Sequence, residues 1–191
     1  MGATSTMARI LVLFAHPAFE RSRVHRQLVA RLPDDPRITF HDLYEAYPDF
    51  DIDVACEQRL LLAHEVIVMQ HPFFWYSTPP IVKQWEDLVL EHGWAYGRQG
   101  TALHGKRIMH VISAGGREAA YQHGGYNRFT IDELLAPLEQ TAVLCGLQWL
   151  PPFVVHGTHR LTDEEISAQA DRYAERLRGL ADDRLETAAP R

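Results

Sequence analysis

The chain has 191 residues, 46% of them hydrophobic, and is long enough for one domain with a complete core. Its 25 acidic side chains outnumber its 19 basic ones, for a net charge of -6. Because the arginines are dispersed among Asp and Glu, the chain lacks the basic surface of a nucleic-acid-binding protein. No apolar stretch approaches the roughly 20 residues of a membrane span.

The two cysteines, Cys56 and Cys145, fall on different predicted helices. With no signal peptide ahead of them, they indicate a protein of the reducing cytoplasm. The histidines form no standard ligand set. His156 and His159 have a zinc-like spacing, but no Cys pair or second close His pair accompanies them. We therefore expect no bound metal.

Strand-like and helix-like segments alternate along the chain. Apolar runs predict strands over residues 9–14, 38–43, 66–70, 108–112 and 147–155, the last bent by Pro151 and Pro152. Apolar residues at helical spacing predict helices over residues 24–32, 53–64, 79–89, 130–146 and 162–177. Thr78 is the expected N-cap of the third helix, and Glu133 and Glu165 complete capping boxes with Thr130 and Thr162.

Strictly alternating strands and helices without an internal repeat predict one doubly wound α/β domain. Right-handed crossovers favour a five-stranded parallel sheet in the order 2-1-3-4-5, with helices on both faces. We expect a disordered leader over residues 1–8, the domain over residues 9–180 and a disordered tail over residues 181–191.

In such a sheet, ligands bind above the carboxyl ends of strands one, three and four. The loop after strand one holds His16 and Ser22, and Ser22 lies at a predicted helix start, where free amides and the helix dipole attract phosphate. Arg23 and His25 add further donors. An ordinary N-cap role for Ser22 is compatible with this interpretation.

The loop after strand three contains the consecutive aromatic residues Phe73, Phe74, Trp75 and Tyr76. Loops are usually polar, so this run indicates a flat ligand, although the rings could instead cover the core. The loop after strand four contains Gly115 and Gly116, which allow a ligand to approach the backbone closely, although a plain turn would also use them. Together the three loops match the phosphate tail, ring and polar ring edge of flavin mononucleotide (FMN).

Motifs along residues 9–178 carry a family resemblance. They are residues 14–17 (FAHP), 42–44 (DLY), 47–50 (YPDF), 70–72 (QHP), 75–77 (WYS), 80–83 (PIVK), 93–97 (GWAYG), 101–106 (TALHGK), 145–147 (CGL) and 149–153 (WLPPF). The chain resembles the flavodoxin-like NAD(P)H quinone oxidoreductases. Within them it is most similar to the ancillary subunits of glutathione-regulated potassium-efflux systems.

The resemblance implies that FMN, rather than FAD, is the cofactor. It places the cofactor against His16, Ser22, Arg23, Val24, His25, Phe73, Phe74, Trp75, Tyr76, Ser113, Ala114, Gly115 and Gly116. The chain departs from the family at two points. His25 stands where relatives commonly have Asn, and Ser113 and Ala114 stand where they have two threonines.

The resemblance also implies the chemistry. The flavin takes a hydride from NADPH or NADH and passes two electrons to a quinone or similar flat electrophile. Tyr121 and His123 are candidate catalytic residues, and Asn127 is an alternative to His123 at the family's histidine position.

Members of this type are homodimers, to which Trp94 and Tyr96 could contribute unless they pack within the monomer. An alternative function is that of a regulatory subunit, which would dock on a potassium-efflux protein at the inner face of the cell membrane.

Overall fold

The computed structural model describes residues 7–182. Most of the expected leader and tail therefore lies outside the described residues. Within them, Ala8 is buried and its N–H donates to the carbonyl of Ala181 at 2.9 Å.

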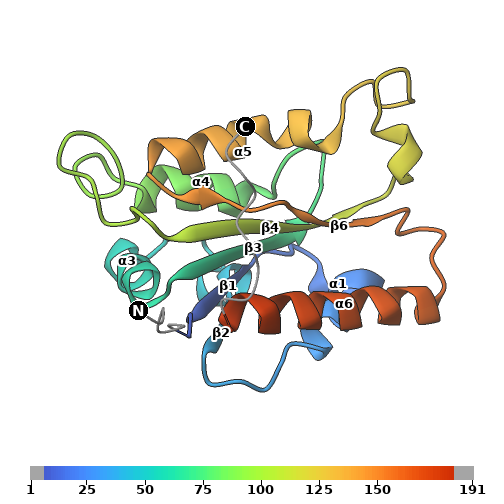
Figure 1. The fold of residues 1–191 in the computed structure, drawn as a ribbon, viewed down its shortest axis with the longest axis horizontal. Helices are drawn as coiled ribbons and strands as arrows, with labels where there is room; N and C mark the ends of the chain where they lie inside the picture. Colours follow the sequence, from blue (N-terminus) through green and yellow to red (C-terminus); the bar gives the residue numbers. More distant parts are fainter. Residues whose placement is uncertain (1–6, 183–191) are drawn as a thin grey trace, which may run out of the picture.

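The described residues form an alternating α/β fold (Figure 1). The strands are β1 (Ile10–Phe14), β2 (Ile38–Asp42), β3 (Val66–Pro72), β4 (Arg107–Ala114), β5 (Gln148–Trp149) and β6 (Phe153–His156). The helices are α1 (Arg23–Ala30), α2 (Leu43–Ala46), α3 (Val54–Ala63), α4 (Pro80–Val89), α5 (Ile131–Leu144) and α6 (Asp163–Ala181). Two 3-10 turns cover Phe19–Arg21 and Glu118–Ala120.

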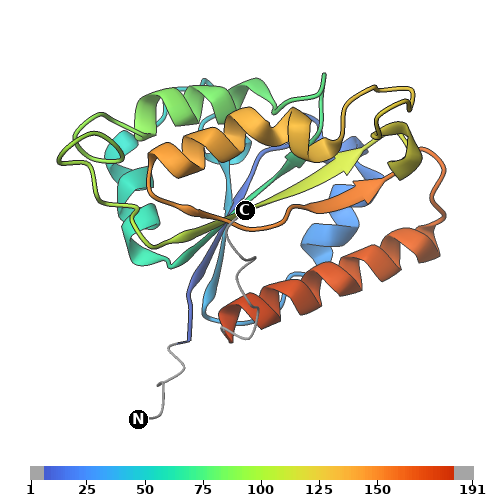
Figure 2. The same ribbon diagram turned by 45° about the horizontal axis from the view of Figure 1, so that its top comes forward.

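The strands form one parallel sheet in the order β2-β1-β3-β4-β5, with β6 also paired to β4. This confirms the predicted order. Helices α3, α4 and α5 cover one face of the sheet, and α1 and α6 cover the other (Figures 1 and 2). Among residues 7–182, none of the helices is both long and apolar enough to span a lipid bilayer.

The centre of the sheet is buried on both faces: every residue of β1 and β3 is buried, and β1 is apolar at every position. In β1, Leu11 and Leu13 pack under α3 and α4, whereas Ile10 and Val12 pack under α1 and α6. Successive side chains of a strand point to opposite faces, so a continuous apolar run supplies both cores.

The predicted fifth strand was wrong in one respect: it is two short strands. Pro151 and Pro152 interrupt it, because proline has no N–H to donate to the ladder, and β5 and β6 pair separately with β4. The start predicted for the third helix was also wrong by one residue. Pro79, not Thr78, is the N-cap of α4, and the helix begins at Pro80. Both predicted capping boxes are confirmed.

A wholly buried carboxylate on α3 connects this helix with β2, α4 and the loop after α2. Glu57 accepts hydrogen bonds from His41 Nε2 at 2.7 Å, the Tyr47 hydroxyl at 2.6 Å and Trp85 Nε1 at 2.8 Å. Burial alone would raise the pKa of Glu57, but these three hydrogen bonds outweigh it, and the pKa lies below its ordinary value.

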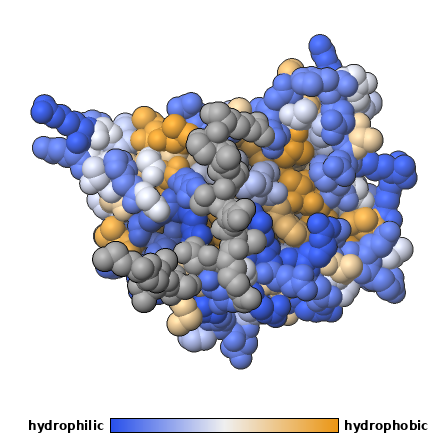
Figure 3. All heavy atoms as spheres, in the orientation of Figure 1, coloured by the Kyte–Doolittle hydropathy of each residue, from blue (hydrophilic) through white to orange (hydrophobic). Residues whose placement is uncertain are grey.

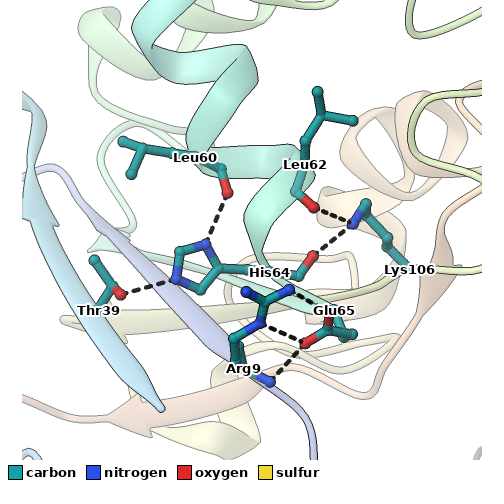
Figure 4. Close-up of polar contacts among 7 residues, drawn as sticks. All are labelled: Arg9, Thr39, Leu60, Leu62, His64, Glu65 and Lys106. Atoms are coloured by element: carbon teal, nitrogen blue, oxygen red, sulfur yellow. Dashed lines mark hydrogen bonds and ion pairs between the residues drawn. The ribbon is translucent and has the colours of Figure 1, made fainter. Parts of the chain in front are cut away.

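At the amino ends of the strands, polar groups are paired within the protein (Figure 4). Lys106 donates to the carbonyls of Leu62 and His64 at 3.2 and 2.7 Å, which satisfies the C-terminal end of α3. Both ring nitrogens of His64 are hydrogen-bonded, to the carbonyl of Leu60 and to the hydroxyl of Thr39.

The surface seen in Figure 3 is largely hydrophilic, with apolar surface in the region of α5 and the β6 edge. In this region Val143 and Leu144 of α5 have exposed fractions of 58% and 56%.

Candidate functional site

The three loops singled out from the sequence surround one hollow at the carboxyl edge of the sheet. Its volume is about 610 Å³. The loops after β1, β3, β4 and β6 line it, with the side chains or backbone of His16, Ala18, Arg21, Ser22, Arg23, Val24, Pro72, Phe73, Phe74, Trp75, Ser113, Gly115, Thr158 and His159.

A second hollow of about 660 Å³ adjoins the first, since Phe73, Trp75 and Gly115 line both. Its further lining is Tyr76, Gly116, Arg117, Ala119, Ala120, Tyr121, Tyr126, Asn127 and Arg160. We call the first hollow the cofactor groove and the second the outer hollow.

The N-terminus of α1 opens into the cofactor groove. The Ser22 side chain caps the helix by accepting the N–H of His25 at 3.1 Å, which is the N-cap role considered above as compatible with phosphate binding. Among the described residues, no acceptor contacts the N–H groups of Arg23 and Val24. Two free donors and the helix dipole are the features that favour an anion at a helix N-terminus. The Arg23 guanidinium turns away and pairs with Asp163 at 2.7 Å.

His25 does not line the groove. Its ring is fully buried behind the groove wall, where Nε2 lies 2.9 Å from the Ser113 hydroxyl. Ala114 is also fully buried and packs in the core. Val24 reaches the groove but is 3% exposed, so its backbone is the part that a ligand would contact.

His16 stands at the groove rim between the first two loops. Its Nδ1 accepts the N–H of Ala18 at 3.1 Å, and its ring meets the Phe74 ring edge-on at 6.1 Å. Burial lowers the pKa of His16, so the neutral imidazole is favoured near pH 7.

The aromatic loop is a tight, strained turn. Trp75 and Tyr76 have φ angles of 51° and 62°, and the Ser77 N–H donates to the carbonyl of Phe74 at 2.9 Å. Two consecutive positive φ angles define a type I′ turn, which usually contains Asn and Gly. The turn leaves Trp75 93% exposed over the groove, whereas Phe73 packs in the core. The loop therefore both covers the core and presents a ring to solvent.

The glycine loop leaves little room for side chains, because neighbouring rings would have to shift to admit a Cβ. A Cβ on Gly115 would lie 3.1 Å from Nε2 of His159, and one on Gly116 would lie 3.0 Å from the Tyr121 ring. Both residues border a hollow, so the missing side chains let a flat molecule approach the backbone.

Of the candidate catalytic residues, Tyr121 and Asn127 line the outer hollow and His123 does not. Tyr121 lines it, and burial raises the pKa of its hydroxyl, although the backbone of Gly116 partly opposes this rise. Asn127 also lines it and accepts the Tyr76 hydroxyl at 3.1 Å. His123 lines neither hollow. Its side chain is 74% exposed, and its Nε2 lies 3.4 Å from a carboxylate oxygen of Glu133.

The sequence reasoning missed the loop after β6. Thr158 and His159 line the cofactor groove, and Arg160 lines the outer hollow. This strand also ends at the carboxyl edge, so its position was the available signal. Within residues 7–182 no group of three or more His, Cys, Asp or Glu side chains could hold a metal ion.

Trp94 and Tyr96, the two residues considered for a subunit contact, are half-buried and pack against the monomer core.

Known proteins share this architecture. The family described as having a flavodoxin-like fold matches residues 8–177. The uncharacterized NAD(P)H oxidoreductase YrkL of Bacillus subtilis is 48% identical over 170 residues, which cover 89% of this chain and 98% of that protein. The glutathione-regulated potassium-efflux system ancillary protein KefF of Salmonella typhi is 45% identical, with coverages of 88% and 94%.

A solved structure also matches. General stress protein 14 of Treponema denticola in complex with FMN has a TM-score of 0.86 and 38% identity, over 90% of this chain and 99% of that one. The chain therefore belongs to the flavodoxin-like family that includes these NAD(P)H oxidoreductases and potassium-efflux ancillary proteins.

Proposed function

We propose that the protein is an FMN-dependent NAD(P)H oxidoreductase that reduces quinones or similar flat electrophiles by two-electron transfer. The observation that carries the proposal is the cofactor groove itself, where unpaired N–H groups, an exposed aromatic ring and a glycine backbone border one hollow. The FMN complex of general stress protein 14 supports the choice of cofactor.

The residues present fit FMN. The N–H groups of Arg23 and Val24 would hold the phosphate, Phe74 and Trp75 would flank the ring, and Gly115 would approach its polar edge. When bound, FMN would supply the hydride and two-electron chemistry. At the ring edge, preorganised backbone amides stabilise negative charge without having to reorient.

The outer hollow offers room for the hydride donor and the acceptor in turn. Because burial raises the pKa of Tyr121, its hydroxyl stays protonated near pH 7 and can donate a hydrogen bond or a proton there. We assign the family's histidine position to Asn127 because Asn127 lines this hollow and His123 does not.

The decisive test is to purify the protein, add FMN and measure flavin absorbance and NADPH or NADH oxidation with a quinone. A protein that gains no flavin absorbance would contradict the proposal. The Tyr121→Phe variant should lower kcat, while Tyr44→Phe serves as the matched control because Tyr44 lies on α2 outside both hollows. Asn127→Ala should cost more activity than His123→Ala, and the reverse order would favour His123.

We also propose a homodimer in which the second copy covers the outer hollow. Tyr126, which lines this hollow, is 91% exposed, and Phe129, three residues further along the chain, is 51% exposed. Such exposed aromatic surface favours a partner over open solvent. Light scattering should give a dimer mass, and Tyr126→Ser should weaken association. A wild-type monomer at micromolar concentration would contradict this proposal.

The alternative function is regulation. The 45% identity to KefF supports docking on a potassium-efflux protein at the inner face of the cell membrane. Co-purification of the full chain with such a membrane protein would support this role. If Tyr121→Phe loses turnover but still activates efflux, the regulatory role does not depend on catalysis. If efflux activation falls with turnover, it does.

A further inference from the structure

Four side chains form a buried hydrogen-bonded chain that ends at the cofactor groove. The Tyr173 hydroxyl of α6 lies 2.9 Å from Gln70 Oε1 on β3, and Gln70 Nε2 lies 3.3 Å from His25 Nδ1 on α1. His25 Nε2 lies 2.9 Å from the Ser113 hydroxyl on β4. Tyr173, Gln70 and His25 are 0% exposed, whereas Ser113 lines the groove.

Two proton arrangements would preserve these contacts. In one, Tyr173 donates to the Gln70 carbonyl oxygen, the Gln70 amide donates to His25 Nδ1, and His25 Nε2–H donates to Ser113. In the other, the Gln70 amide is turned so that its oxygen and nitrogen exchange places, every bond is reversed, and the Ser113 hydroxyl donates to His25. A neutral imidazole has one N–H, so the two arrangements correspond to the two tautomers of His25.

The Tyr173 end of this hydrogen-bonded series decides between the two proton arrangements. In the reversed arrangement the Gln70 amide would donate to the Tyr173 oxygen, and the hydroxyl proton of Tyr173 would have no acceptor among the described residues. Leaving a buried donor unpaired is costly. Burial also raises the pKa of Tyr173 and lowers that of His25, so Tyr173 keeps its proton and His25 is neutral.

We propose that Tyr173 and Gln70 are positioning residues that hold His25 as the Nε2–H tautomer and thereby leave the Ser113 hydroxyl as a hydrogen-bond donor to the cofactor. The Ser113 oxygen accepts from His25, and its own proton has no other partner among the described residues, so it is directed to the groove. The ligand part of this inference rests on the proposed function, because it takes the recipient to be an acceptor atom of FMN.

The first test is a double-mutant cycle. FMN dissociation constants of the full-length protein are measured by flavin fluorescence for the wild type, Ser113→Ala, Tyr173→Phe and the double variant. Loss of one neutral hydrogen bond weakens binding about 2- to 12-fold. We expect Ser113→Ala to show this loss, Tyr173→Phe to show a loss of the same kind from a site without cofactor contact, and the double variant to bind no worse than Ser113→Ala. Ser113→Thr, which keeps the hydroxyl, should restore binding.

The matched control is Tyr47→Phe, which removes a buried hydroxyl that hydrogen-bonds Glu57 in the other core. It should lower stability without changing FMN affinity. Additive losses in the cycle, or an equal loss in Tyr47→Phe, would overturn the proposal.

The second test reads the tautomer directly. Nitrogen-15 NMR of the full-length protein should show His25 protonated at Nε2, with the resonances assigned by their absence in His25→Asn. The Nδ1–H form should become populated in Tyr173→Phe. A wild-type His25 protonated at Nδ1 would overturn the proton order. If the wild type bound no FMN, the proposed function would fail, while the NMR result would still decide the proton order.

Discussion

Trp75 is predicted to reduce the stability of the fold while it supports cofactor binding. It adopts a left-handed conformation with φ of 51°, is followed by a second such residue, and buries almost none of its side chain. The informative perturbations are Trp75→Gly, which removes the ring and relieves the backbone strain, and Trp75→Ala, which removes the ring alone.

The magnitude follows from the backbone. A non-glycine residue in the left-handed region costs about 1–2 kcal/mol, whereas glycine adds about 0.5–1 kcal/mol of chain entropy to the cost of folding. The difference between the two terms leaves Trp75→Gly more stable than Trp75→Ala by up to about 1.5 kcal/mol. For a chain of this size 1 kcal/mol corresponds to about 2–4 °C in Tm. In a regular helix or strand the sign would be opposite.

Both substitutions of Trp75 should weaken FMN binding relative to the wild type. Stacking on an aromatic side chain contributes about 1–3 kcal/mol per ring, so both variants should bind FMN about 5- to 150-fold more weakly. Urea unfolding of the FMN-free protein measures the first effect, and fluorescence titration with FMN measures the second. A glycine variant less stable than the alanine variant would refute the strain argument, and unchanged affinity in both would refute the stacking argument.

Three further substitutions test the charged groups. Glu57→Gln should lower the free energy of unfolding by about 2–4 kcal/mol at pH 7, because the three donors on His41, Tyr47 and Trp85 lose their buried carboxylate acceptor. The pKa of Glu57 is depressed in the folded protein, so the difference in unfolding free energy between wild type and variant should narrow as pH falls below about 4.5. A difference in urea unfolding that did not change with pH would contradict this prediction. Glu86 borders a small apolar space between α4 and α5, where burial raises its pKa to about 7. Ionising Glu86 in the folded protein therefore lowers stability as pH rises from about 4.5 to 7. Glu86→Gln should raise the free energy of unfolding by up to about 3 kcal/mol at pH 8 and by far less at pH 5. Equal effects at the two pH values would refute this prediction. Lys106→Met should lower the free energy of unfolding by about 1 kcal/mol, because the carbonyls of Leu62 and His64 at the end of α3 lose their donor. Unchanged urea unfolding would contradict this role of Lys106.

The sequence predicts those parts of the fold that local chemistry decides. Continuous apolar runs such as residues 10–14 identify buried strands, and the Thr130 and Thr162 capping boxes give the starts of α5 and α6 within one residue. The division of the last strand was harder to predict, because Pro151 and Pro152 remove ladder hydrogen bonds without ending the extended conformation.

The sequence predicted which loops border the hollow, but less well which side chains line it. Loop positions follow from sheet order, which brings the ends of β1, β3 and β4 to one edge. Side-chain direction depends on contacts between distant segments. His25 follows the phosphate loop in sequence, yet it turns inward because Ser113 and Gln70, 88 and 45 residues away, offer hydrogen-bond partners.

The two edges of the sheet differ in how fully their polar groups are paired. At the amino edge Lys106, His64 and Glu65 find partners within the protein (Figure 4). At the carboxyl edge the first N–H groups of α1 have no acceptor among the described residues, and Trp75 holds a strained, exposed conformation. Unpaired donors and backbone strain lower the stability of the folded protein, and the free energy of binding a ligand there would offset this cost. A ligand that met both would therefore stabilise the folded protein, so FMN should raise the Tm, and by a smaller amount in Trp75→Gly than in the wild type.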